Sequence, residues 1–263
     1  MKALSYEELK RIYLAVGERR GWDFSTLKRE KEPLPWDYEK IVRKYVKRSD
    51  KVLDIGTGGG ELFIKISPFF ERGIGIDHNT KRLKVANENL PPQLKNRISF
   101  MVMEAQKLEF EDNSFDIVLN CHAAIFADEI ARVLKPGGFF ISQQVGGENA
   151  GNIFKTFGWP PSGEYWKQYW AKKGLKPRNI ENASDDFRKF GIEIVERKSA
   201  NTKYWFKDVP SLIFWLKSVP LPEKFDIKKH LKAVNRLIEE FSTERGIETN
   251  EHRELLVVKK PQI

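Results

Sequence analysis

The sequence predicts an α/β protein with a doubly wound, mostly parallel sheet and a helical cap. Between about residues 51 and 145, short apolar segments alternate with helical patterns. Apolar strands that alternate with helices are typical of a parallel sheet covered on both faces, and right-handed crossovers make such a sheet doubly wound. After about residue 146 the alternation stops and aromatic residues gather, which we interpret as the cap.

Composition limits the class of protein. The chain has 263 residues, of which 40% are hydrophobic and 32% charged, as in soluble globular proteins. No apolar run approaches the roughly 20 residues that span a membrane, and the first residues lack the apolar region of a signal peptide. The lone Cys121 excludes an intrachain disulfide, which fits a reducing compartment. From these observations we expect a cytoplasmic protein without a membrane partner. Four scattered histidines and one cysteine offer no metal-ligand spacing, and no metal is expected.

Two helices are expected before the alternating region. Ser5 and Glu8 form a capping box for a helix over residues 5–16. Residues 22–35 are expected to be irregular, and a second apolar stripe predicts a helix over residues 38–46. The strands expected next are residues 51–55, 73–77, 98–103, 115–119 and 139–142, with helices between them.

The rest of the chain carries the aromatic cap and two further strands. Its first aromatic residues are Phe154, Phe157, Trp159, Tyr165, Trp166, Tyr169 and Trp170. A helix is expected before Gly191, followed by a strand at 192–196 that residues 204–206 extend or follow. Helices are then expected at 208–218 and 226–243, and a last strand at 254–258.

A glycine-rich turn follows the first strand of the alternating region. Asp54 lies near the end of that strand, Gly56 opens the turn, and a helical pattern begins at Glu61. Glycine lets a ligand lie against bare backbone, and the free N–H groups with the positive end of the helix suit an anionic group. The dinucleotide pattern G-x-G-x-x-G fails by one residue, because Glu61 stands where its third glycine is required.

Five motifs in order and spacing resemble those of class I S-adenosylmethionine-dependent methyltransferases. They are residues 54–60, Asp77 at the end of the second strand, residues 104–105 after the third, residues 115–118 in the fourth, and the turn at 132–138. In these motifs the chain is similar to the ubiquinone/menaquinone and biotin biosynthesis methyltransferases, which are of the small-molecule type. The resemblance covers roughly residues 36–145.

The resemblance implies the organisation of the whole chain. It implies a sheet of seven strands, the last antiparallel, in a single methyltransferase domain over residues 1–263. The cofactor-binding core would comprise about residues 37–146 with strands near 192–206 and 252–259. The cap would come from residues 1–36, 150–190 and 207–250.

The resemblance also implies S-adenosylmethionine as cofactor and S-adenosylhomocysteine as product. The cofactor-binding candidates are Asp54, Gly56, Thr57, Gly58, Asp77, His78, Glu104, Ala105 and Asn120. A carboxylate at the end of the second strand can accept both ribose hydroxyl protons. Glu104 can accept from the adenine amino group. Backbone N–H groups near the glycines and the Asp54 region offer opposite partners for the carboxylate and ammonium of the methionine part.

Residues for the methyl acceptor are expected after the fourth strand and in the cap. His122 is the catalytic candidate, as a general base or a cofactor contact, and a helix-capping role is equally compatible. Cys121 fits a small buried hydrophobe better than a nucleophile. The substrate candidates are Trp36, Tyr38, Gln143 and Trp166.

Methyl transfer to a small organic acceptor is therefore the expected function. RNA methylation is the alternative, because the net charge is +9 and lysines are interleaved with the aromatics of residues 165–173. Against it, the basic residues are spread among acids without a block of like charge. A second alternative is a cofactor-binding protein without catalytic activity.

Overall fold

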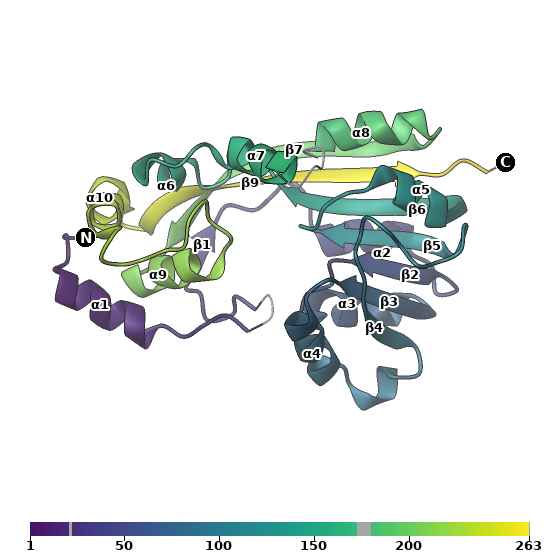
Figure 1. Ribbon diagram of the computed structural model, residues 1–263, viewed down its shortest axis with the longest axis horizontal. Coiled ribbons are helices and arrows are strands. Elements are labelled where there is room, and N and C mark those ends of the chain that lie inside the picture. Colours follow the sequence, from purple (N-terminus) through teal and green to yellow (C-terminus); the bar gives the residue numbers. More distant parts are fainter. Residues whose placement is uncertain (21–22, 173–179, 263) are drawn as a thin grey trace.

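The computed structural model describes residues 1–20, 23–172 and 180–262, and in these residues a single mixed sheet runs through the molecule (Figure 1). Its strand order is β1-β7-β9-β6-β5-β2-β3-β4, and β8 pairs with β9. The strands of its parallel half are β2 (Lys51–Ile55), β3 (Arg72–Asp77), β4 (Ile98–Val102), β5 (Phe115–Cys121) and β6 (Leu134–Val145). The predicted doubly wound, mostly parallel sheet is confirmed.

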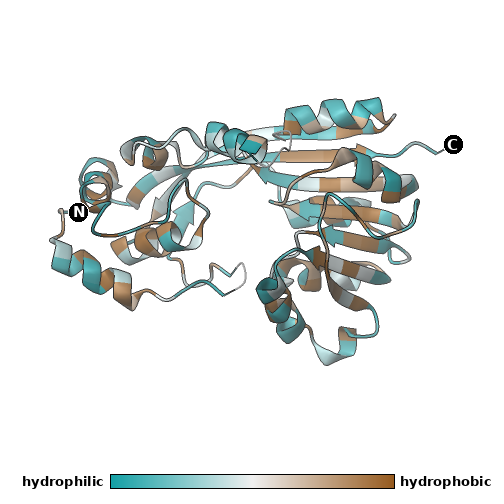
Figure 2. Cartoon of the chain, in the orientation of Figure 1, coloured by the Kyte–Doolittle hydropathy of each residue, from teal (hydrophilic) through white to brown (hydrophobic). Residues whose placement is uncertain are grey.

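Helices cover both faces of this parallel half. On one face lie α2 (Tyr38–Tyr45) and α3 (Glu61–Ile66), which continues as a short 3-10 helix. On the other face lie α5 (Ala127–Val133) and α8 (Ile180–Lys189). Helix α4 (Thr80–Asn89) contacts β3 and β4. The strands of the parallel half are largely hydrophobic, whereas α4 and α8 carry many hydrophilic residues (Figure 2).

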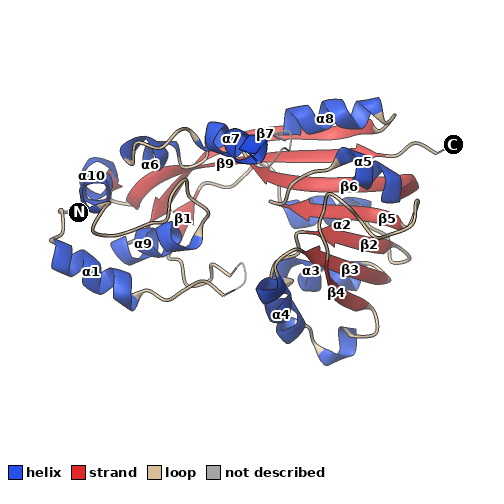
Figure 3. Cartoon of the chain, in the orientation of Figure 1, coloured by secondary structure: helices blue, strands red, loops and turns tan. Residues whose placement is uncertain are grey.

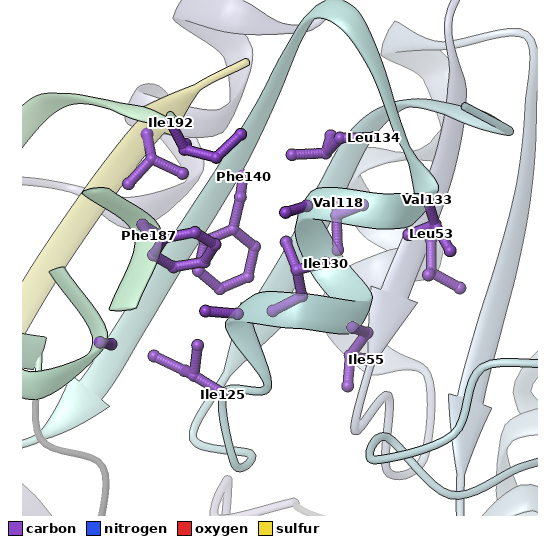
Figure 4. Packing of buried hydrophobic residues seen from close by; sticks show 14 of the residues in the cluster. Leu53, Ile55, Val118, Ile125, Ile130, Val133, Leu134, Phe140, Phe187 and Ile192 are labelled. Atoms are coloured by element: carbon purple, nitrogen blue, oxygen red, sulfur yellow. The ribbon is translucent and has the colours of Figure 1, made fainter. Parts of the chain in front are cut away.

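The alternation of side chains along the strands builds two separate cores. In β5, Ile117 packs with the α2 and α3 side, and Val118 packs with α5 and α8. Figure 4 shows the second of these cores, where Phe187 of α8 lies against Phe140 of β6 with ring centroids 5.3 Å apart. Both residues are fully buried, so α8 belongs to the sheet packing.

Two long antiparallel strands extend the sheet beyond this core. They are β7 (Glu193–Phe206) and β9 (Gly246–Lys259), which pair with each other along most of their length. Figure 3 shows both strands running from the core to a group of helices at the other end of the molecule. These helices are α1 (Tyr6–Ala15), α6 (Gly151–Thr156), α9 (Val209–Ser218) and α10 (Leu231–Phe241). Their apolar faces form a third core with the far ends of the two strands.

Two short strands and one helix complete the described elements. Strand β1 (Arg29–Lys31) pairs antiparallel with the end of β7, and β8 (Ser242–Thr243) pairs with the start of β9. Helix α7 (Ser162–Lys172) contributes residues to the wall of the cavity described below.

The structure corrects three details of the sequence prediction. The stretch expected to be irregular contains β1. Strands β1 and β8 are additional to the seven strands expected. Among those seven, β9 is the antiparallel strand. Helix α8, expected in the cap, packs on the core because Ile180, Ala183 and Phe187 form its buried face. The turn expected at 132–138 comprises the end of α5 and the irregular first residues of β6, where the register with β5 shifts. Residues 21–22 and 173–179 of the expected cap lie outside the described residues.

Candidate functional site

The glycine turn closes over the ends of β2 and β3. The amides of Gly56 and Thr57 both donate to the carbonyl oxygen of Ile76, at 2.8 and 2.9 Å. Gly56 has a φ of 75°, a conformation that favours glycine. A Cβ atom at this position would lie 2.4 Å from the Cβ of Ala123, so the turn packs directly against the loop after β5.

Asp77 lies at the end of β3 with its side chain buried against the turn. Its carboxylate accepts from the amide of Gly58 at 3.1 Å and from the amide of Asn79 at 2.9 Å. The Arg82 guanidinium and the exposed His78 ring lie 3.6 and 3.7 Å from its two oxygens. The carboxylate is thereby fixed at the carboxyl end of the strand, where open α/β sheets bind ligands.

Asp54 is a second buried carboxyl group at the same edge of the sheet. Burial raises its pKa to about 7, and the neighbouring Asp77 contributes to the increase. A cation placed beside Asp54 would favour its ionised form, because opposite charges lower the pKa of a carboxyl group. The pair of carboxyl groups therefore suits a ligand that carries a positive charge.

The loop after β5 is held by Asn120. Its fully buried side chain accepts from the amide of Ala123 at 3.1 Å and from Gln144 at 2.8 Å, and donates to the carbonyl of Ala124 at 3.1 Å. These bonds fix the loop that carries His122. The sequence pointed to Asn120 as a cofactor contact, and the structure shows that its side-chain hydrogen bonds are made with the loop and with Gln144 of β6.

His122 occupies this loop in a left-handed conformation, with a φ of 68°. Its Nδ1 atom is buried and has no hydrogen-bond partner among the residues that the structure describes. Burial, together with the nearby charges of Arg253 and Lys31, lowers its pKa to about 3. The ring is therefore neutral at physiological pH and a weak proton acceptor in the ligand-free protein.

Tyr38 and Trp36 pack behind the site. The Tyr38 hydroxyl donates to the carbonyl of Ile141 at 3.0 Å, and the Trp36 indole N–H donates to Oε1 of Gln143 at 2.9 Å. Both rings are buried in the core of α2 and α3. The pKa of the Cys121 thiol is raised to about 12, mainly by burial, so it is a thiol at neutral pH.

A cavity of about 990 Å³ lies between the parallel core and the cap. Its core side is lined by Glu61, His122, Ala123 and Gln143, and its cap side includes Trp166 of α7. The structure thus brings three of the predicted residues, His122, Gln143 and Trp166, to one cavity next to the glycine turn. Trp36 and Tyr38 do not line it.

Glu104 and Ala105 follow β4 at the same edge of the sheet. Glu104 is exposed, its carbonyl oxygen accepts from the amide of Lys107, and Ala105 packs against the core beside α5. The preceding amide of Met103 donates to the carbonyl of Asp77, which ties this connection to the end of β3.

The N-terminal segment reaches the glycine turn from the other side. Arg20 forms an ion pair of 2.5 Å with Glu88 of α4. Burial lowers the pKa of Arg19 to about 10; nearby Arg82 also lowers it, and Glu61 at the start of α3 raises it. The segment before residue 21 therefore lies beside the turn and α4, next to the site.

Sequence reasoning missed the charged residues on the cap side of the cavity. Arg29 and Lys31 of β1 and Glu251 and Arg253 of β9 all line it. The only sequence signal was the alternation of charged residues along 29–31 and 251–253. No helix among the described residues is long and apolar enough to cross a membrane, and no group of three or more metal-ligating side chains is found in them.

The geometry fits S-adenosylmethionine. The glycine turn has no room for a Cβ at Gly56, two buried carboxyl groups face one edge of the sheet, and the buried Nδ1 of His122 lacks a partner. Together with the strand order, these features define the Rossmann-like fold of class I methyltransferases.

Comparison with known proteins agrees with this class. Residues 53–142 match the family model described as a methyltransferase domain. These residues form a class I S-adenosylmethionine-dependent methyltransferase domain.

The relatives differ in how much of their length the chain covers. An uncharacterized methyltransferase of Bacillus subtilis, YcgJ, is 36% identical over 98 residues, which are 35% of this chain and 39% of that protein. The malonyl-[acyl-carrier protein] O-methyltransferase of a Marinomonas species is 26% identical over 200 residues, 70% of each chain. The crystal structure of a putative methyltransferase from Bacillus halodurans superposes with a TM-score of 0.61 at 19% identity, covering 86% of this chain and 99% of that one.

Proposed function

We propose that the chain transfers a methyl group from S-adenosylmethionine to a small organic acceptor. The observation that carries this proposal is the pair of buried carboxyl groups, Asp54 and Asp77, at the glycine turn beside a large cavity. The methyltransferase relatives support the reaction, and two of them are named for small or carrier-bound organic acceptors: the malonyl-[acyl-carrier protein] enzyme and a 2-methyl-6-phytyl-1,4-hydroquinone methyltransferase of Synechocystis.

When bound, S-adenosylmethionine supplies a sulfonium methyl group that a nucleophilic acceptor atom displaces in line, leaving S-adenosylhomocysteine. The residues of the chain bind the cofactor and the acceptor and orient them for this displacement. In this proposal Asp77 accepts from the ribose hydroxyls, Asp54 faces the ammonium group, and Glu104 and Ala105 contact adenine. Thr57, Gly58 and His78 complete the cofactor side.

On the acceptor side, the proposal assigns orientation and exclusion of water to the cavity walls. Gln143, held by the Trp36 indole, presents its amide at the cavity wall. Trp166 closes the opposite side. Neutral His122 contacts the acceptor through its unpartnered Nδ1 atom, and it acts as a base only if binding raises its pKa.

The size of the cavity favours a small acceptor over a polymer. A volume of about 990 Å³ is at the upper end of the range of small-molecule sites, which is roughly 300 to 1,000 Å³. The lysines and aromatics of α7 support RNA as the alternative acceptor. Steep salt dependence of RNA binding would favour that alternative, and no retention on RNA at low salt would dismiss it.

Calorimetry with S-adenosylhomocysteine tests the cofactor part of the proposal. We expect saturable binding by the parent protein and much weaker binding by Asp77→Ala; Asp185→Ala, on the exposed face of α8, is the control and should bind like the parent. Absence of binding by the parent would refute the proposal. Binding without turnover across a broad panel of metabolites and RNAs would instead favour an inactive cofactor-binding protein.

A further inference from the structure

The cap side of the cavity is the face of a three-stranded antiparallel sheet. Lys31 of β1 is paired in register with Tyr204 of β7, which is paired with Thr249 of β9. Residues two apart on a strand share a face, so Arg29, Glu251 and Arg253 point to the same side. All of them line the cavity, which shows that this face is its floor.

Positive charge exceeds negative charge on this floor. Glu251 is the carboxylate between two cations: Lys31 Nζ lies 2.9 Å from one of its oxygens, and Arg253 Nη2 lies 2.9 Å from the other. Arg29 is close enough to both Glu251 and Arg253 to act on their pKa values. Three cations therefore share one carboxylate.

Burial strengthens the attraction of this excess positive charge for an anion. The side chains of Glu251 and Arg253 are only 9% and 17% exposed, so solvent screens them weakly. Lys31, at 39% exposed, opens toward the cavity. The other carboxyl groups on the cavity wall, Asp23, Glu61, Glu164 and Glu254, are not among the main influences on the pKa of Glu251 or of Arg253.

The cluster lies next to the loop that follows β5. Arg253 and Lys31 are near enough to His122 to lower its pKa. His122 lines the same cavity, and its buried Nδ1 atom has no hydrogen-bond partner among the described residues. An anion bound here would lie between the floor and the loop that the proposed function assigns to the acceptor.

Aromatic rings form much of the remaining wall, beside polar side chains such as Gln143 and Asn149. The rings are those of Phe24, Phe154, Trp166, Trp170, Phe206 and Trp215. A cavity with one cationic end and aromatic walls is complementary to a molecule with an anionic head and an apolar body.

We propose that the methyl acceptor is an amphiphilic organic anion whose carboxylate or phosphate group binds to Arg29, Lys31 and Arg253, with its apolar body against the aromatic walls. This inference rests on the proposed function and specifies its substrate class. The anionic group is an anchor for the acceptor, and Glu251 keeps the cations in position for it.

Paired ligands test the proposal on the protein loaded with S-adenosylhomocysteine. The probes are cinnamate, octanoate and phenyl phosphate, each compared with a neutral counterpart: cinnamamide, octanamide and phenol. We expect an acid to bind roughly tenfold or more tightly than its neutral counterpart, the gain typical of a charge-assisted hydrogen bond. Tighter binding of phenyl phosphate than of both carboxylates would identify phosphate as the anchor, and the reverse order would identify a carboxylate.

Matched variants locate the binding. Lys31→Gln should weaken acid binding roughly tenfold and leave the neutral counterpart unaffected. The control is Lys203→Gln, which removes the same charge from the opposite face of the sheet, where Lys203 pairs with Glu248 at 3.2 Å. Arg29→Gln, on a short edge strand, serves as a second variant that leaves the Glu251 ion pairs intact.

Three results would overturn the proposal: equal binding of acids and their neutral counterparts, no saturable binding of any acid, or equal effects of Lys31→Gln and Lys203→Gln. The proposal would also be overturned if Lys31→Gln weakened the binding of S-adenosylhomocysteine as much as the binding of the acids, because the cluster would then belong to the cofactor side. Each of these leaves the proposed function standing as long as the parent binds S-adenosylhomocysteine. Failure of that binding would refute the proposed function itself.

Discussion

Replacement of Asp54 by asparagine tests the charge partner at the glycine turn. Asp54 has a pKa of about 7 in the ligand-free protein, raised mainly by burial. If the ammonium group of the cofactor lies beside it, the bound state requires the ionised carboxylate. Binding below pH 7 must then release a proton, so affinity for S-adenosylhomocysteine should decrease as the pH falls.

The size of this effect follows from the fraction of ionised Asp54. Affinity should decrease roughly tenfold for each pH unit below 7, and about 100-fold in total between pH 8 and pH 5. His122 does not contribute in this range, because its pKa is about 3. Cys121 does not contribute either, since its pKa is about 12.

Calorimetry of S-adenosylhomocysteine binding at several pH values measures the effect. Two buffers with different ionisation enthalpies should report the release of about one proton at pH 5. Asp54→Asn has nearly the same shape but cannot ionise, so its affinity should be weaker at pH 8 and almost independent of pH. A parent protein with pH-independent affinity, or a variant with the same slope as the parent, would refute the reasoning.

Asp54→Asn should weaken cofactor binding but increase the stability of the ligand-free protein. Because the folded state of the ligand-free protein raises the pKa of Asp54, it binds this proton more tightly than the unfolded state does. The resulting contribution to the free energy of unfolding is complete below about pH 4 and is lost as the pH rises through 7; it is at most about 4 kcal/mol. Thermal denaturation should therefore show Asp54→Asn to be more stable than the parent at pH 8, with a smaller difference at pH 5. Equal differences at both values would contradict the assignment.

Three further predictions concern the turn and the loop beside it. Gly56→Ala should weaken S-adenosylhomocysteine binding and destabilise the protein by more than the roughly 1–2 kcal/mol of a left-handed non-glycine residue. The control is Gly158→Ala, which is also at positive φ but has open space around it, so it should cost only this backbone energy. Denaturant unfolding measures the difference. The NMR signals of the His122 ring, assigned with His122→Asn, should not titrate between pH 5 and pH 8; titration near 6.5 would show that the ring is not desolvated. Trp36→Phe should lower the free energy of unfolding by about 1 kcal/mol through loss of the bond to Gln143, with unchanged affinity for S-adenosylhomocysteine; a large loss of affinity would place Trp36 in the cofactor site.

The cluster around the glycine turn, which we propose as the cofactor side, was predictable because its signals are local in the sequence. Asp54 and the glycines follow an apolar strand directly, and Asp77 ends the next strand, so the parallel order of the sheet brings them to one edge. The buried alternation in β5, with Ile117 and Val118 on opposite faces, is also visible in the sequence as an apolar run. Motif order then sufficed to predict the class.

The charged floor, which we propose as part of the acceptor side, was not predictable because it depends on pairing between distant residues. Strand β1 has three residues, too few for a periodic signal, and it exists because it pairs with β7 about 175 positions later. Lys31 and Glu251 meet only through this pairing. For α8 the apolar face was visible, but nothing in the sequence distinguishes packing on the core from packing in the cap.

The long pair of β7 and β9 has a mechanical consequence. These strands pair with each other from the core to the cap, with a single register shift between Ile194 and Glu196, so a continuous ladder joins the cap to the core. At about 3.3 Å per residue, 14 residues form a beam of roughly 45 Å. The distance between the glycine turn and the cationic floor is therefore set by the strand register. Insertion of a single residue in β9 between the core and Arg253 would turn Thr249, Glu251 and Arg253 toward the opposite face, which would remove the contribution of β9 from the floor in one step.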